Sequence, residues 1–141
     1  MLPGDQIEYT VYYLNARADE AEQVRICDWI QANQSVVSGL YNGNDVELQV
    51  GDGTGSTTYE LTLANDTNDR AQLATVDALP AGPTCNLPAG SAGTTDDVIV
   101  IDLTGTTGDP AAVTTTLPGS IAPGTPDEAF GFIRFTTQVN D

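Results

Sequence analysis

Oxygen-bearing side chains gather in two neighbouring loops in the first half of the chain. Asn42, Asn44 and Asp45 stand close together in sequence, and Asp52 lies in the next loop. Calcium takes its ligands from carboxylate, amide and carbonyl oxygens in loops of this kind. The spacing does not fit the helix-flanked calcium loop, which ends in a bidentate glutamate. Two interpretations stand: a calcium site, or ordinary turn chemistry in which Asn and Asp side chains bond to their own backbone.

The two cysteines, Cys27 and Cys85, are far apart in sequence. Two thiolates cannot complete a four-ligand zinc site without histidine, and the sequence contains no histidine. We therefore predict a disulfide that crosses the fold from one sheet to the other, which implies an oxidising compartment. The alternative is a pair of buried, reduced thiols that act as small apolar residues.

The residue types that most hydrolytic sites require are missing. The sequence has neither histidine nor lysine to serve as a general base. The carboxylate pair Asp96 and Asp97 does not replace them, because adjacent residues on a strand point to opposite faces of a sheet. The sequence predicts a protein that is not an enzyme, with no catalytic residues and no cofactor unless calcium binds.

The length and charge of the chain limit its number of domains and the partners it can bind. The chain of 141 residues has a formal net charge of -16, from 20 acidic residues against four arginines. One domain over residues 1–141 is expected at this length. An acidic surface repels phosphate backbones, which argues against nucleic acid as a partner. No apolar run has the length of a membrane span, so membrane insertion is not expected.

The elements that must position these residues are strands. Residues 6–14 alternate, with Ile7, Tyr9, Val11 and Tyr13 on one face. Two stretches, 64–95 and 104–126, are interpreted as long loop excursions. The pattern predicts an all-β fold, an immunoglobulin-like Greek-key β-sandwich of about seven strands. The other predicted strands cover residues 23–30, 35–41, 46–50, 57–63, 98–103 and 129–139.

The sequence also predicts what some of the strand residues contact. In 23–30, Val24 and Ile26 share one face, while Cys27 and Trp29 share the other, and we expect Trp29 to pack in the core near the disulfide. Residues 98–103 are apolar on both sides, which indicates a central strand covered on both faces. Arginines 25 and 134 lie within strands among an excess of acids, so we expect them to pair with carboxylates.

The chain resembles a known family at several of these positions. Pro3-Gly4-Asp5, the strand that follows it, Val24 to Asp28, and Phe130 to Phe135 are similar to a cyanobacterial-type branch of the bacterial "conserved repeat" domain. That family has no known function, is immunoglobulin-like, and occurs singly or in tandem in secreted and cell-surface proteins. The resemblance implies an exported, surface-associated role without enzymatic activity, and it transfers no catalytic residue.

One departure from the family pattern suggests where another chain could bind. In the family, a short strand precedes the Pro-Gly-Asp turn, and this chain begins at that turn. We expect the first strand to be missing, which would leave an open edge for strand addition. Two explanations stand: the chain is a fragment that lacks this strand, or a neighbouring subunit supplies it. The residues of that expected self-assembly edge are Gln6, Ile7, Glu8, Tyr9, Thr10 and Val11.

Two functions follow as expectations. The first is a secreted or cell-surface structural protein, the subunit of a filament in which each subunit adds a strand to its neighbour. Its partner would be a copy of itself or a neighbouring repeat of a surface protein. The second is an adhesin or a repeat module of a larger surface protein, which recognises glycan or protein through its loops, with or without calcium.

Overall fold

The computed structural model describes residues 1–51, 55–64, 70–88, 90, 95–104, 116–119 and 129–141. Within these residues the regular structure consists of strands alone, so the described chain contains no helix of a length and apolarity that could cross a membrane. The strands are β1 (Gln6–Leu14), β2 (Ala21–Glu22), β3 (Arg25–Trp29), β4 (Gln34–Val36), β5 (Val46–Gly51), β6 (Ser56–Leu61), β7 (Ala71–Thr75), β8 (Asp97–Asp102), β9 (Thr116–Leu117) and β10 (Phe130–Val139).

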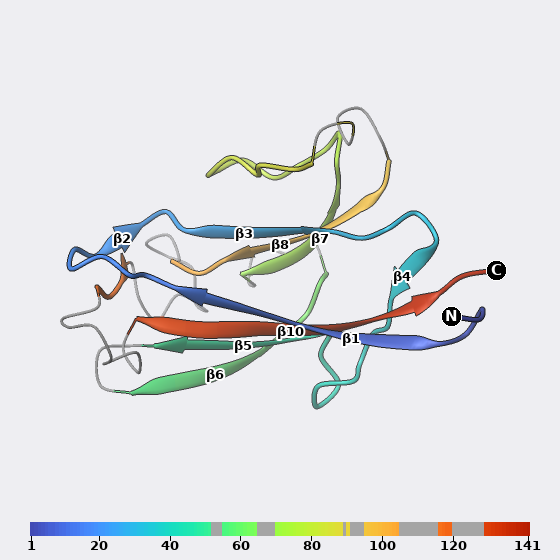
Figure 1. Ribbon diagram of the computed structural model, residues 1–141, viewed down its shortest axis with the longest axis horizontal. Coiled ribbons are helices and arrows are strands. Elements are labelled where there is room, and N and C mark those ends of the chain that lie inside the picture. Colours follow the sequence, from blue (N-terminus) through green and yellow to red (C-terminus); the bar gives the residue numbers. More distant parts are fainter. Residues whose placement is uncertain (52–54, 65–69, 89, 91–94, 105–115, 120–128) are drawn as a thin grey trace.

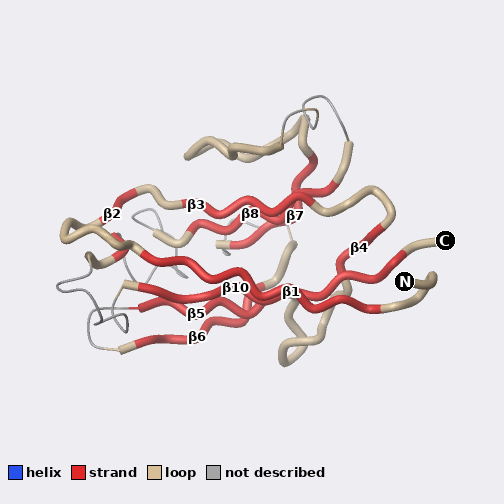
Figure 2. The backbone as a smooth tube through the Cα atoms, viewed as in Figure 1, coloured by secondary structure: helices blue, strands red, loops and turns tan. Residues whose placement is uncertain are grey.

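The strands form two main antiparallel sheets that lie one above the other (Figures 1 and 2). The larger sheet has the order β1-β10-β5-β6, and β4 also pairs with β10 beyond the end of β5. The smaller sheet has the order β3-β8-β7, and β2 and β9 form a separate short ribbon. The predicted all-β class is confirmed, as two antiparallel sheets packed as a sandwich.

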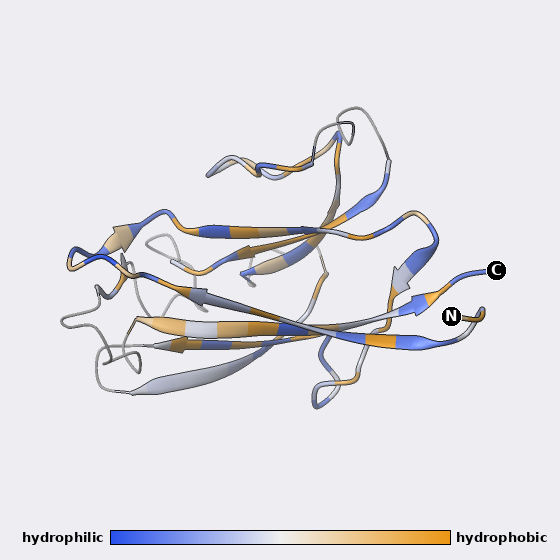
Figure 3. Cartoon of the chain, in the orientation of Figure 1, coloured by the Kyte–Doolittle hydropathy of each residue, from blue (hydrophilic) through white to orange (hydrophobic). Residues whose placement is uncertain are grey.

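The core lies between the two sheets and follows the alternation of the sequence. Val46, Leu48 and Val50 of β5 are buried, as are Ile133 and Phe135 of β10. They pack with the inward residues of the smaller sheet in one hydrophobic cluster. Hydrophobic and hydrophilic bands alternate along β10 in Figure 3. Full burial of each large apolar side chain contributes about 1.5–3 kcal/mol, which makes this cluster the main stabilising feature of the sandwich.

Strand β8 is the central strand of the smaller sheet, and it is covered on both faces, as its sequence predicts. Ile99 and Ile101 point into the core cluster. Val98 and Val100 belong to the opposite face, and they are no more than 1% exposed. The second face is covered by residues 76–88, here called the outer loop, which lie over the smaller sheet on the side away from the core (Figure 1).

Gly131, the second residue of β10, has no side chain, and this lets the side chain of Tyr13 cross β10 closely. Tyr13 of β1 reaches over Gly131, and its hydroxyl donates a hydrogen bond of 2.7 Å to the carbonyl of Gln49 in β5. A Cβ atom at position 131 would collide with that carbonyl and with the Tyr13 hydroxyl. Burial raises the pKa of Tyr13, so the phenol stays protonated and keeps donating. The tyrosine thereby joins three adjacent strands of the larger sheet.

Three strands were not expected from the sequence. All seven predicted strands are present, with the one at 35–41 reduced to β4, and the short strands β2 and β9 are additional. The interpretation of 64–95 as one long loop is wrong, because it contains β7, a full partner of β8. Within the predicted excursion 104–126, β9 pairs with β2, and most of that stretch lies outside the described residues.

Candidate functional site

Strand β1 is an edge strand of the larger sheet and pairs with a neighbour on one side only. Its nine residues pair with β10 in an unbroken antiparallel register, from Gln6 opposite Gln138 to Leu14 opposite Phe130. In the described part of the chain, no strand pairs with its other side. All six residues of the predicted self-assembly edge, 6–11, belong to this strand.

The register reveals which backbone groups of β1 point away from the sheet. Just beyond β1, the Asn15 N–H donates to the Ala129 carbonyl, and just before it, the Asp5 carbonyl accepts from Val139. Hydrogen-bonded and non-hydrogen-bonded pairs alternate along an antiparallel ladder. The odd-numbered residues of β1 therefore direct their N–H and C=O groups at β10. The outward residues, whose backbone groups point to the free side, are Gln6, Glu8, Thr10, Tyr12 and Leu14.

The side chains of β1 divide in the same alternating way. The rings of Tyr9 and Phe135 stack with centroids 5.2 Å apart, on the face that packs against the core. On the opposite face, Tyr12 is 70% exposed and Leu14 is 56% exposed. The Tyr12 ring meets Phe132 edge to face, with centroids 6.0 Å apart. The outer patch, defined as Tyr12, Leu14, Phe130 and Phe132, thus lies beside the free side of β1.

Within its own residues, β1 lacks the features that usually protect a terminal strand. Natural sheets protect their edges with lysine, proline, bulges or very short strands. Strand β1 carries one charged residue, Glu8, contains no proline or glycine, and keeps its register without a bulge. A long, regular and partly apolar edge of this kind is a template for the addition of another strand.

Arg134 of β10 pairs with carboxylates on both neighbouring strands, Glu8 of β1 and Glu47 of β5. Its Nη1 lies 3.3 Å from a Glu47 carboxylate oxygen, and its Nε lies 3.8 Å from a Glu8 carboxylate oxygen. The guanidinium carbon also stands 5.0 Å from the centroid of the Phe132 ring. The arginine therefore neutralises part of the acidic charge next to β1, and the prediction that it pairs with carboxylates is confirmed.

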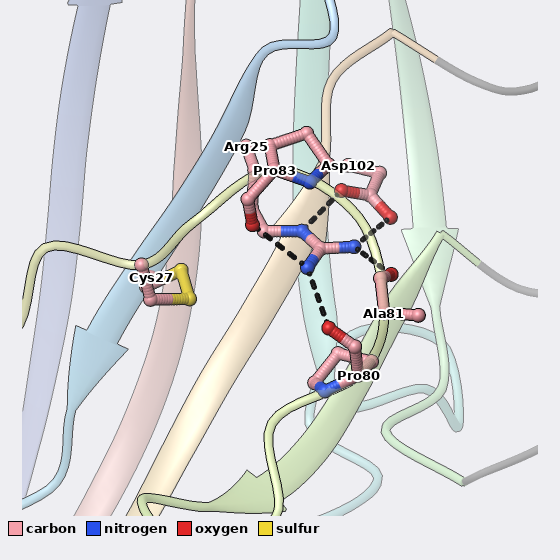
Figure 4. The surroundings of a disulfide bond; sticks show 7 residues. Arg25, Cys27, Pro80, Ala81, Pro83 and Asp102 are labelled. Atoms are coloured by element: carbon pink, nitrogen blue, oxygen red, sulfur yellow. Dashed lines mark hydrogen bonds and ion pairs between the residues drawn. A yellow bond between two sulfur atoms is a disulfide. The ribbon is translucent and has the colours of Figure 1, made fainter.

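Cys27 and Cys85 form a disulfide, but it does not cross the sandwich (Figure 4). Their Cα atoms are 5.7 Å apart, and the bond joins β3 to the outer loop. The predicted location is wrong because Cys27 lies on the face of β3 opposite to Val24 and Ile26, and those two residues pack against the core. The disulfide therefore fixes the outer loop over the smaller sheet.

Arg25 fixes the same loop a few residues away (Figure 4). Its guanidinium donates to both carboxylate oxygens of Asp102, at 2.6 and 3.0 Å. It also donates to the backbone carbonyls of Pro80, Ala81 and Pro83, at 3.0 to 3.1 Å. The side chain of Arg25 is only 3% exposed. This set of contacts, here called the arginine clamp, satisfies polar groups of two strands and the loop together.

Trp29 also belongs to the outer face and not to the core. It is partly buried, and its indole N–H donates to an Asp96 carboxylate oxygen at 3.2 Å. The expectation that Trp29 packs in the core is wrong for the same reason as the location of the disulfide. Because Cys27 and Trp29 are two residues apart on one strand, they share the face that the outer loop covers.

Three of the four predicted calcium ligands, Asn42, Asn44 and Asp45, make hydrogen bonds in or beside the turn between β4 and β5. Asp45 accepts backbone N–H bonds from Gly39 and Leu63, one at each carboxylate oxygen, at 3.0 and 2.8 Å. The amide nitrogen of Asn42 donates to Glu60, and the backbone of Asn44 pairs with that of Tyr41. Asp52 lies outside the described residues. Within the described chain, no three or more His, Cys, Asp or Glu side chains are grouped as metal ligands.

Asp28 is a carboxylate that faces the space between the sheets. It stands opposite Ile99 in the β3–β8 register, and alternation places it on the same side as Ile26. No described residue makes a hydrogen bond or an ion pair with its carboxylate. Partial burial raises the pKa of Asp28 above its ordinary value of 3.8. The ionised form is therefore less well solvated in the fold than in the unfolded chain.

We expect an Asp28→Asn variant to be more stable than the wild type at neutral pH. The raised pKa means that ionisation destabilises the fold, increasingly as pH rises from the ordinary value through the folded one. The gain should therefore shrink as pH falls and vanish below pH 3.8, where both states are protonated. Denaturant unfolding at pH 7 and pH 3 measures the difference, with the exposed Asp19→Asn as control. An equal difference at both pH values would contradict this account.

A cavity opens between the outer loop and β7. It has a volume of about 410 Å³. Its walls combine backbone and side chains of β7 with the first part of the outer loop, so its shape depends on the arginine clamp, which holds Pro80. The lining residues are 72–75 of β7, with Ala78, Pro80 and Asp97.

Comparisons with known proteins add no assignment to these features. Neither a protein-family model, nor a curated protein, nor a solved structure matches the chain.

The outer patch and the arginine clamp are the parts that the sequence analysis did not foresee. A signal for the patch was present, because Tyr12 and Leu14 are large apolar residues at positions that the alternation assigns to the outside of β1. For the clamp, the sequence predicted only that Arg25 would meet a carboxylate. The three carbonyls come from the outer loop, whose path over β3 has no pattern in the sequence.

Proposed function

We propose that this protein is a non-enzymatic structural subunit that assembles outside the cell into a filament or fibre, by strand addition along the free side of β1. The observation that carries this proposal is the row of outward residues in β1, whose backbone groups have no described partner. Backbone hydrogen bonds to an added strand would satisfy them, at about 0.5–1.5 kcal/mol net for each bond.

Three further features support the same function. The exposed outer patch gives an added strand apolar side chains to pack against. The disulfide suits an oxidising, extracellular setting. The antiparallel two-sheet architecture is compatible with the immunoglobulin-like Greek-key sandwich that the family resemblance implies, a fold frequent in surface proteins. The partner would then be a second copy of the chain or a neighbouring repeat.

A ligand-binding adhesin is the alternative, favoured by the cavity beside β7. Its lining mixes apolar residues such as Leu73 and Pro80 with the polar Gln72, Thr75 and Asp97, and a concave site of this kind can receive a small ligand or part of a larger partner. An adhesin would bind through this region and would have no need of the β1 edge. The two functions therefore predict different results for a variant in which strand addition at β1 is blocked: the filament subunit would lose assembly, and the adhesin would keep its binding.

We expect a Thr10→Pro variant to stay folded and to lose assembly. Proline removes an N–H, and the N–H of Thr10 points to the free side, so the β1–β10 ladder keeps its bonds. Proline is tolerated on terminal strands when its missing N–H faces outward. Sedimentation velocity over a range of concentrations, with negative-stain microscopy, measures the assembly. Thr10→Val keeps the N–H and is the matched control, which should assemble like the wild type.

A comparison of Thr10→Pro with Val11→Pro tests which N–H groups of β1 point to the free side and which point at β10. The N–H of Val11 points at β10, so this variant should lose stability, whereas Thr10→Pro should not. A wild-type protein that stays monomeric at high concentration, or a Thr10→Pro variant that assembles normally, would contradict the proposal. In either case the cavity beside β7 becomes the region to examine.

A further inference from the structure

We propose that the strand added to β1 is β1 of a second copy, in antiparallel orientation, about a two-fold axis at Thr10. This inference rests on the proposed function and specifies its partner and geometry. Such a contact joins the two larger sheets into one continuous sheet, β6-β5-β10-β1 followed by the same order reversed. The contact uses the free side of β1 in both copies and closes at two subunits, so the dimer becomes the unit of assembly and growth into a filament proceeds through a second surface of that dimer.

The alternation of hydrogen-bonding groups along β1 selects this register. Two copies of β1 related by a two-fold axis can pair only where outward residues oppose outward residues. With the axis at Thr10, Gln6 opposes Leu14 of the partner subunit, Glu8 opposes Tyr12 of the partner subunit, and Thr10 opposes itself. Every outward residue then has a partner across the axis. An axis moved along the strand by one or more residues leaves at least one outward residue of β1 unpaired.

The charge on β1 favours the same register. Glu8 is the one charged residue of β1, and an axis at Glu8 would place two carboxylates directly opposite each other, which is destabilising. With the axis at Thr10, the residue facing Glu8 is Tyr12 of the partner subunit, whose hydroxyl can donate to a carboxylate. The central pair is threonine against threonine, one of the favourable cross-strand pairs. The register that uses the whole strand also avoids the like-charge contact.

The outer patch also fits an axis at Thr10. Tyr12 and Leu14 stand at one end of β1, and Gln6 and Glu8 at the other. The two-fold axis places the apolar end of one copy beside the polar end of the other. Each exposed apolar side chain of β1 therefore gains a neighbour across the contact. The Tyr12 ring keeps its edge-to-face contact with Phe132 of its own chain.

Cysteine cross-linking tests the register. In a Thr10→Cys variant, the two introduced thiols meet at the axis, where opposing Cα atoms of a hydrogen-bonded pair lie about 5.5 Å apart, within disulfide range. In the matched Gln6→Cys variant, the thiols are separated by eight positions along the strand, about 27 Å. Under mild oxidation with the native disulfide intact, we expect at least about tenfold more covalent dimer from Thr10→Cys than from Gln6→Cys.

A mixture of Gln6→Cys and Leu14→Cys proteins provides a second readout, because these positions oppose each other across the axis. The mixture should yield a mixed dimer, and neither protein alone should do so. Peptide mapping by mass spectrometry verifies that Cys27 remains bonded to Cys85. Equal cross-linking of Thr10→Cys and Gln6→Cys, with no mixed dimer, would overturn the symmetric register.

The result separates the two levels of the proposal. If Thr10→Pro abolishes assembly but Thr10→Cys does not cross-link, β1 receives a different strand, such as β6 of a neighbour or a foreign segment. The proposed function then stands and the two-fold contact is rejected. If Thr10→Pro leaves assembly unchanged, strand addition at β1 is rejected together with the two-fold contact.

Discussion

An Arg25→Ala variant is expected to lose about 3–5 kcal/mol of folding free energy, because the Arg25 side chain is only 3% exposed and makes five hydrogen bonds. The truncation leaves the Asp102 carboxylate without its bidentate donor. It also leaves the carbonyls of the outer loop at Pro80, Ala81 and Pro83 without their donor. Urea unfolding followed by circular dichroism measures the loss.

Arg25→Lys is the informative control for the arginine clamp. Lysine keeps the charge, but its ammonium cannot present the planar fork that meets two carboxylate oxygens and three carbonyls together. We expect its stability to lie between those of the wild type and Arg25→Ala. If both variants unfold within 0.5 kcal/mol of the wild type, roughly the limit for an ordinary surface substitution, the clamp does not hold the loop.

Replacing both cysteines by alanine is expected to destabilise the fold by about 4 kcal/mol in the chain-entropy model. The disulfide closes a loop between residues 58 positions apart, and cutting it returns that freedom to the unfolded chain. The same loss should follow reduction of the wild type with dithiothreitol, measured by urea unfolding with and without reductant. A loss below about 1 kcal/mol would mean that the arginine clamp alone keeps the outer loop in place.

The losses from the arginine clamp and the disulfide should not add. Both hold the outer loop, and neighbouring interactions with a shared partner are coupled. In a variant that lacks Arg25 and both cysteines, we expect a total loss smaller than the sum of the separate losses. The double-mutant cycle measures this coupling, and strict additivity would show that the two devices act on independent parts of the structure.

The strands of the larger sheet were predictable because their alternation is strong. Val46, Leu48 and Val50 recur at every second position, and Ile133 and Phe135 do the same in β10. Strand β7 was missed because Leu73 is its only large apolar residue, and Ala71 is buried without bulk. Its place in the sheet is determined by pairing with β8, a tertiary effect that the local sequence does not encode.

The location of the disulfide could have been derived from the alternation. With Val24 and Ile26 facing the core, Cys27 must face outward, and a cysteine on an outer face can bond only to a segment that lies over that face. The direction of the backbone groups in β1 is a different case. This direction depends on which residues of β10 lie opposite those of β1. The register is set by the pairing of the two strands in the folded sheet and cannot be read from the sequence of either strand.

The fold leaves few positive charges free at its surface. Of the four arginines, Arg25 and Arg70 are buried, and Arg134 is paired with carboxylates. The 20 acidic residues therefore have little to balance them, and two approaching copies repel each other. Repulsion between exposed charges is screened over about 10 Å at 0.1 M salt. For the proposed contact at β1, ionic strength would therefore act as a threshold: dilute media would keep two copies apart, and saline media would let the short-range contacts prevail.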